Sequence, residues 1–140
     1  MKDNVLLTIS SLLSVLLFMF HLADDIVRGF EKGGFSNLTA VPICVLWLYG
    51  TLVLAGRRSG YIIILLASFL SLGIPILHTW GAGLVGGRIA NSSGVFFWVW
   101  TLLGLGVTGL FSFILSVRGL WNLRRGRLRK VEQAGGLAIS

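Results

Sequence analysis

The sequence is poor in charge. Only 12% of its 140 residues are charged, whereas 55% are hydrophobic, and the mean hydropathy is +0.88. Soluble domains carry about 25% charged residues. A water-soluble fold of this length could not cover so much apolar surface. The shortage of charge therefore excludes an ordinary soluble domain and indicates that lipid surrounds most of the chain.

Cysteine and proline are also scarce. The single cysteine, Cys44, excludes an internal disulfide and is expected to pack as a small apolar residue. Of the two prolines, Pro42 falls in the first turn of a predicted helix, where its missing N–H costs little. Pro75 falls inside another predicted helix and is expected to bend it just before His78.

The few charged residues leave four uncharged stretches, at residues 4–23, 33–56, 59–87 and 89–117. A charge at the bilayer centre costs roughly 2.5–3.5 kcal/mol on insertion scales, and a spanning helix needs about 20 residues. Each stretch is long enough for one crossing. We therefore predict an all-α, four-transmembrane-helix bundle of up-down-up-down topology, with helices at about 5–27, 38–55, 60–80 and 95–123.

We assign residues 1–123 to a single four-helix membrane domain and residues 124–140 to a basic cytoplasmic tail. The first apolar run, Val5–Ala23, is longer than the roughly 7–15 residues of a secretory signal core. It also lacks a convincing small-residue cleavage site. We therefore expect it to be a retained helix.

The distribution of basic residues predicts the orientation of the bundle. Lysine and arginine near helix ends concentrate on the cytoplasmic side. Three of the twelve basic residues fall on one predicted side: Arg28, Lys32 and Arg88. The other nine fall on the opposite side: Lys2, Arg57, Arg58, Arg118, Arg124, Arg125, Arg127, Arg129 and Lys130. This asymmetry predicts a multi-pass protein of the cytoplasmic (plasma) membrane with both termini in the cytoplasm.

All of the nine except Lys2 are interpreted as anchors on anionic lipid headgroups, each contributing about 1 kcal/mol near the surface. The net charge of +7 could suggest a nucleic-acid partner. However, the basic run follows a helix end directly and lacks interleaved aromatic residues beyond Trp121, so we expect no nucleic-acid binding. Other aromatic residues gather near the predicted outer interface: Trp80, Phe96, Phe97, Trp98 and Trp100.

Small residues recur at intervals of four along the last predicted helix, at Gly104, Thr108, Ser112 and Ser116. Helices in lipid associate through close packing of small residues, since lipid removes the apolar driving force. We interpret this stripe as contact between helices of one bundle. The alternative is a face for a membrane-protein partner or a second copy of the chain.

The most specific chemical pattern is a group of His and Asp residues at the predicted outer face. His21, Asp24 and Asp25 lie within one helical turn and would project from one side of the first helix. His78 ends the third helix at a similar height. In an up-down-up-down bundle these two helices are diagonal partners, so the two imidazoles could meet.

These four residues are our candidate metal ligands. Two His and one or two carboxylates suit a transition metal such as Zn²⁺, Fe²⁺ or Cu²⁺. Two opposed His could instead hold a haem, although the position near the interface fits haem less well. A purely structural interpretation also exists, in which Asp24 pairs with Arg28 and His21 bonds to a neighbouring Asp.

The sequence therefore leaves three functional hypotheses. The first is a non-enzymatic interaction or accessory subunit of a membrane complex, because the loops are short and no apolar run holds a charge. The alternative is a metal- or haem-binding membrane protein that uses the His–Asp group. A small transporter or channel would need a polar stripe through the whole bilayer, and packing explains the Ser and Thr stripes more simply.

Overall fold

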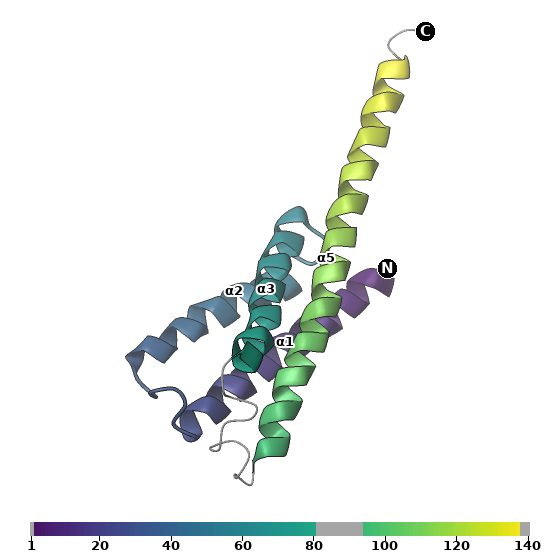
Figure 1. The fold of residues 1–140 in the computed structure, drawn as a ribbon. Helices are drawn as coiled ribbons and strands as arrows, with labels where there is room; N and C mark the ends of the chain where they lie inside the picture. The colour runs from purple at the N-terminus through teal and green to yellow at the C-terminus, as the bar shows by residue number, and fades with distance from the viewer. Residues whose placement is uncertain (1, 81–93, 138–140) are drawn as a thin grey trace.

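The computed structural model describes the backbone of residues 2–80 and 94–137, and the side chains of residues 2–78 and 94–126. Within these residues the chain is helical and forms no strand. The elements are α1 (Lys2–Val27), the 3-10 helix η1 (Phe35–Thr39), α2 (Ala40–Leu52), α3 (Arg58–Trp80) and α5 (Val95–Leu137) (Figure 1). The predicted all-helical class is confirmed over the described residues.

Among the described residues, four segments are long and apolar enough to cross a membrane: Lys2–Val27, Phe35–Leu52, Arg58–His78 and Val95–Gly126. They coincide with the four predicted helices, and η1 together with α2 makes up the second. Pro42 lies in the first turn of α2, as expected. The last helix differs from the prediction, because α5 continues beyond residue 123 to Leu137. The continuation, residues 124–137, contains four Arg, two Leu and one each of Lys, Glu, Gln and Ala, all good helix formers, against three Gly, and no proline interrupts it.

The helices expose apolar side chains and bury polar ones. Large apolar residues on every helix are exposed, among them Leu6, Val45, Leu66 and Phe96. Serine side chains are instead fully buried between the helices: Ser11, Ser14, Ser68, Ser71, Ser112 and Ser116. This arrangement is costly in water but matches a bundle whose outer surface faces lipid.

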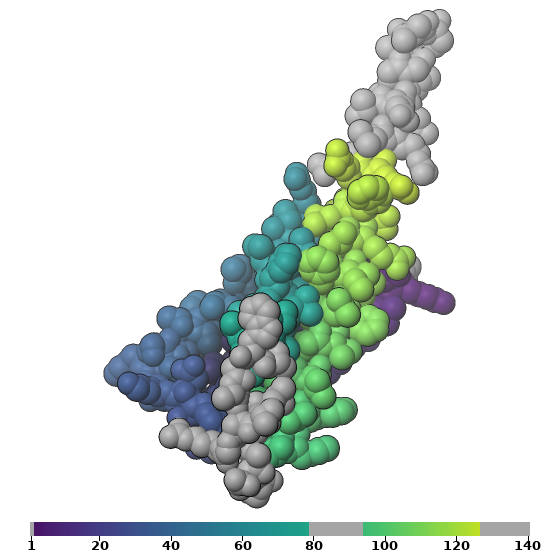
Figure 2. Space-filling model, viewed as in Figure 1, coloured from purple at the N-terminus to yellow at the C-terminus, as the bar shows by residue number. Residues whose placement is uncertain are grey.

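Helix α5 packs along both α1 and α3, while α2 packs mainly on α3. Figure 1 shows the η1 end of α2 diverging from the other helices, and Figure 2 shows α2 to one side of the molecule. The predicted small-residue stripe lies inside the bundle. A Cβ at Gly104 would lie 3.0 Å from Leu17 Cδ1 of α1, and Thr108 Oγ1 lies 2.8 Å from Ser14 Oγ.

Two contacts define which chain segments share one end of the bundle. Arg118 of α5 forms an ion pair with Asp3 at 3.3 Å, and the Tyr61 hydroxyl donates a hydrogen bond to Asn4 Oδ1 at 2.6 Å. The start of α1, the start of α3 and the basic part of α5 therefore lie together. His21, His78 and Trp98 lie at the opposite end, where the candidate site forms.

Candidate metal centre

Helix α1 carries two of the candidate ligands on one face. His21 and Asp25 are four residues apart, so their side chains lie one turn apart on the same side of the helix. His21 Nε2 lies 3.6 Å from Asp25 Oδ2. Both residues are buried, with only 3% of His21 and 5% of Asp25 exposed. A buried carboxylate needs a charged or hydrogen-bonded partner, so this face of α1 is a candidate functional site.

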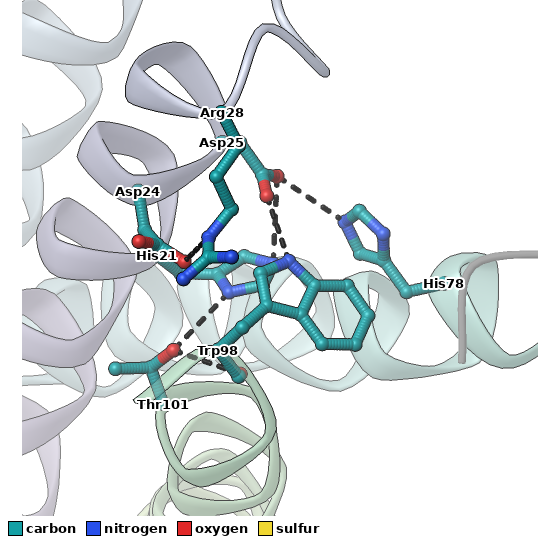
Figure 3. A network of polar contacts seen from close by, with 7 residues as sticks. All are labelled: His21, Asp24, Asp25, Arg28, His78, Trp98 and Thr101. Carbon is teal, nitrogen blue, oxygen red and sulfur yellow. Dashed lines mark hydrogen bonds and ion pairs between the residues drawn. The ribbon is translucent and has the colours of Figure 1, made fainter. Parts of the chain in front are cut away.

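Helix α3 adds His78 to this pair. His78 Nε2 also lies 3.6 Å from Asp25 Oδ2, and the two imidazole rings meet edge to face with centroids 4.9 Å apart (Figure 3). α3 reaches this point through Pro75, which sits so near α5 that a Cβ at Gly106 would lie 3.3 Å from Pro75 Cγ. The expectation that the first and third helices bring their imidazoles together agrees with this arrangement.

Asp24, the fourth predicted ligand, lies apart from the other three. Its Oδ2 accepts a hydrogen bond from Arg28 Nε at 2.7 Å, an ion pair between residues one turn apart. The structure therefore brings together His21, Asp25 and His78, whose potential ligand atoms lie within 4.8 Å of one another. Asp24 instead forms the i,i+4 ion pair with Arg28 that the structural interpretation of the sequence described.

Helix α5 contributes two residues that the sequence interpretation missed. Trp98, which was grouped with the interfacial aromatic residues, is fully buried with 0% exposed. Its Nε1–H donates a hydrogen bond to Asp25 Oδ1 at 2.8 Å, so Oδ2 is left facing the two imidazoles (Figure 3). Thr101 lies next to His21, with 3.3 Å between Thr101 Oγ1 and His21 Nδ1. A Trp and a Thr three residues apart are a signal too common to assign to a site from sequence.

The Thr101 hydroxyl determines the tautomer of His21. It donates its hydrogen to the Trp98 carbonyl oxygen at 3.0 Å, since a carbonyl can only accept. The same hydroxyl oxygen must therefore accept from His21, which places a hydrogen on Nδ1. In the neutral ring Nε2 then carries a lone pair. This buried Nε2 makes no hydrogen bond in the structure and faces Asp25 Oδ2.

An imidazole lone pair facing a carboxylate oxygen is unfavourable unless a proton or a metal ion lies between them. Two ligands of a tetrahedral ion, each about 2.0–2.1 Å from it, lie about 3.3 Å apart. The two 3.6 Å distances to Asp25 Oδ2 are close to that value. The hydrogen bonds from His21 to Thr101 and from Trp98 to Asp25 are also the kind of outer contacts that orient metal ligands.

A cavity of about 150 Å³ lies beside the three residues and is lined by Phe18, His21, Leu22, Asp25, Glu31, Ile74 and His78. It has room for an ion and water, but it is smaller than the roughly 300–1,000 Å³ typical of sites for drug-sized ligands. The two imidazole centroids lie only 4.9 Å apart, too close for the rings to flank a haem iron from opposite sides. This geometry favours a single metal ion over haem.

Comparison with known proteins identifies no relative: the chain matches no protein family model, no curated protein and no solved structure. The other predicted anchor residues that the structure describes have exposed side chains and lie apart from the ligands: Arg57, Arg58, Arg118, Arg124 and Arg125. Arg118 pairs with Asp3 at the bundle end opposite the site. Arg88 and the side chains of Arg127, Arg129 and Lys130 fall outside the described residues.

Proposed function

We propose that this chain is a four-span integral membrane protein that binds one divalent transition-metal ion through His21, Asp25 and His78. The observation that carries the proposal is the buried Nε2 of His21, which has no hydrogen-bond partner and faces the Asp25 carboxylate. Imidazole nitrogen and carboxylate oxygen suit Zn²⁺, Fe²⁺ or Cu²⁺. Three protein ligands leave a position for water or another ligand, as in exchangeable zinc sites.

We also propose that both termini face the cytoplasm and that the metal centre lies toward the outer face of the plasma membrane. The Asp3–Arg118 ion pair and the Asn4–Tyr61 hydrogen bond support this orientation, because they gather the strongly basic segments at one end. Anionic headgroups of the cytoplasmic leaflet attract those segments. An accessory role in a membrane complex is compatible with a metal centre and stays a prediction.

The test is metal binding by the purified full-length chain in detergent. After chelation and reloading with Zn²⁺, we expect about one ion per chain by elemental analysis. The variants His21→Ala and Asp25→Asn should lose stoichiometric binding, and His78→Ala should weaken it by at least about tenfold, because each removes one ligand.

Asp24→Asn is the matched control, because it removes a carboxylate from the same helix turn that bonds to Arg28 and not to the ligands. It should keep the wild-type stoichiometry. Circular dichroism and gel filtration check that each variant remains folded. Equal Zn²⁺ binding by folded His21→Ala and wild type would refute the proposed site, and a Soret band in the preparation would support haem instead.

A further inference from the structure

A second, larger cavity adjoins the one beside the three ligands. The second cavity has a volume of about 310 Å³ and shares Phe18, Leu22 and Glu31 with the first. Ser36, Asn37 and Thr39 contribute polar groups to its lining. One cavity therefore adjoins the η1 segment and the other adjoins the imidazoles. Glu31 is the acidic residue among the shared ones, so it borders both cavities.

The backbone ties Glu31 to a ligand. α1 ends at Val27, and Gly29 reverses the chain with φ of +73°, a conformation that glycine adopts without strain. The N–H groups of Phe30 and Glu31 then both donate to the Asp25 carbonyl oxygen, at 2.9 and 3.2 Å. This turn holds Glu31 at a set position relative to the Asp25 carboxylate. Unlike Asp25, Glu31 is exposed and so remains hydrated.

We propose that Glu31 captures the hydrated cation from the outer solution and passes it to His21, Asp25 and His78. This inference rests on the proposed metal centre. An exposed carboxylate attracts a divalent ion without removing its water, whereas the buried ligands bind only after the ion has lost water. Among the described residues, the basic groups nearby are Arg28 and Lys32, and the pairing of Arg28 with Asp24 offsets its repulsion of a cation.

The proposal predicts a change in rate, which Co²⁺ can report. Bound in a site of low coordination number, Co²⁺ gives visible absorption that stopped-flow mixing can follow. For the full-length chain in detergent at low salt, Glu31→Gln should slow association about fivefold and leave dissociation unchanged. Glu31→Asp should restore most of the rate. The difference should shrink at about 1 M salt, where screening acts over about 3 Å.

The control is Asp3→Asn, because it removes one negative charge at the opposite end of the bundle, where Asp3 pairs with Arg118. If it slows association as much as Glu31→Gln, general surface charge is responsible and the role of Glu31 is overturned. Faster dissociation from Glu31→Gln would also overturn the proposal, since it would make Glu31 a permanent ligand. If Glu31→Gln binds Co²⁺ at the wild-type rate, the capture role of Glu31 is refuted and the metal centre is not. Absence of Co²⁺ binding by the wild type would refute the metal centre as well.

Discussion

The chemistry of the site depends on a chain of three hydrogen bonds that begins on α5. Thr101 donates to the Trp98 carbonyl and accepts from His21, while the Trp98 indole donates to Asp25. These bonds select the His21 tautomer and choose which Asp25 oxygen faces the imidazoles. Neither Trp98 nor Thr101 would touch the metal. They orient the residues that would bind it.

Replacing Trp98 with Phe tests this orienting role. The variant keeps an aromatic ring in the buried position but removes the N–H that donates to Asp25 Oδ1. We expect Zn²⁺ affinity to fall about 10–100-fold, the usual effect of losing an outer contact to a metal ligand. Competition with a chromophoric chelator measures the change.

Trp100→Phe provides the matched control. Trp100 is two residues away on the same helix and is exposed. Its ring stacks on that of Phe96, with the ring centroids 6.4 Å apart. Its replacement should leave Zn²⁺ affinity within about twofold of wild type. An equal loss in both variants would mean that general packing of α5, and not the bond to Asp25, supports the site.

Which residues form the site could be predicted from sequence only in part. The i,i+4 spacing of His21 and Asp25 and the height of His78 were enough to place these three together. Spacing could not separate Asp25 from Asp24, because both lie within one turn of His21 and the choice depends on helix rotation. Trp98 was missed because an aromatic residue near a helix end has the same pattern whether it faces lipid or the bundle.

At the level of helices, close contact between α3 and α5 sets the position of Trp98 relative to His78. A Cβ at Gly109 would lie 2.6 Å from Ser71 Cβ, and Ser71 is itself fully buried. Such proximity is available to a glycine but not to a larger residue. The sequence stripe at Gly104, Thr108, Ser112 and Ser116 indicated one packing face of α5 but not which helix it meets; Gly104 and Thr108 lie against α1. It did not reveal Gly106 and Gly109, which face α3.

Gly109→Ala should therefore destabilise the protein. The added methyl group meets a Cβ close to the backbone of α3, so the helices must separate, and overpacking of this kind costs about 1–3 kcal/mol. SDS titration of the detergent-solubilised protein measures the change in the free energy of unfolding.

Gly73→Ala is the control, because Gly73 lies inside α3 with no neighbouring atom within 4 Å of an added Cβ. This variant should be as stable as wild type or slightly more stable, since alanine favours the helix. If Gly109→Ala were as stable as Gly73→Ala, the close approach of α3 and α5 would not be needed for stability.

At the scale of the molecule, the four apolar spans of the described residues and their order followed from the spacing of charges, because the cost of a charge in lipid is large compared with other sequence signals. The length of α5 did not follow, since charge rules stop at the membrane surface and say nothing of a helix that continues in water. The sides on which the ends lie remain a prediction.

A pair of reporter fusions tests that prediction. Green fluorescent protein attached after Ser140 should fluoresce, and alkaline phosphatase attached at the same place should be inactive, because the basic end is held in the cytoplasm. The same reporters inserted after Gly34 should give the opposite result. Active phosphatase after Ser140 would reverse the orientation and place the metal centre on the cytoplasmic side.

The labelled residues of Figure 3 come from α1 with its following turn, from α3, and from α5. A ribosome releases these segments in that order. A nascent chain that has inserted only α1 to α3 holds all three ligands but neither Trp98 nor Thr101 to orient them. If the proposed metal centre forms, tight binding would therefore begin only after α5 has joined the other helices.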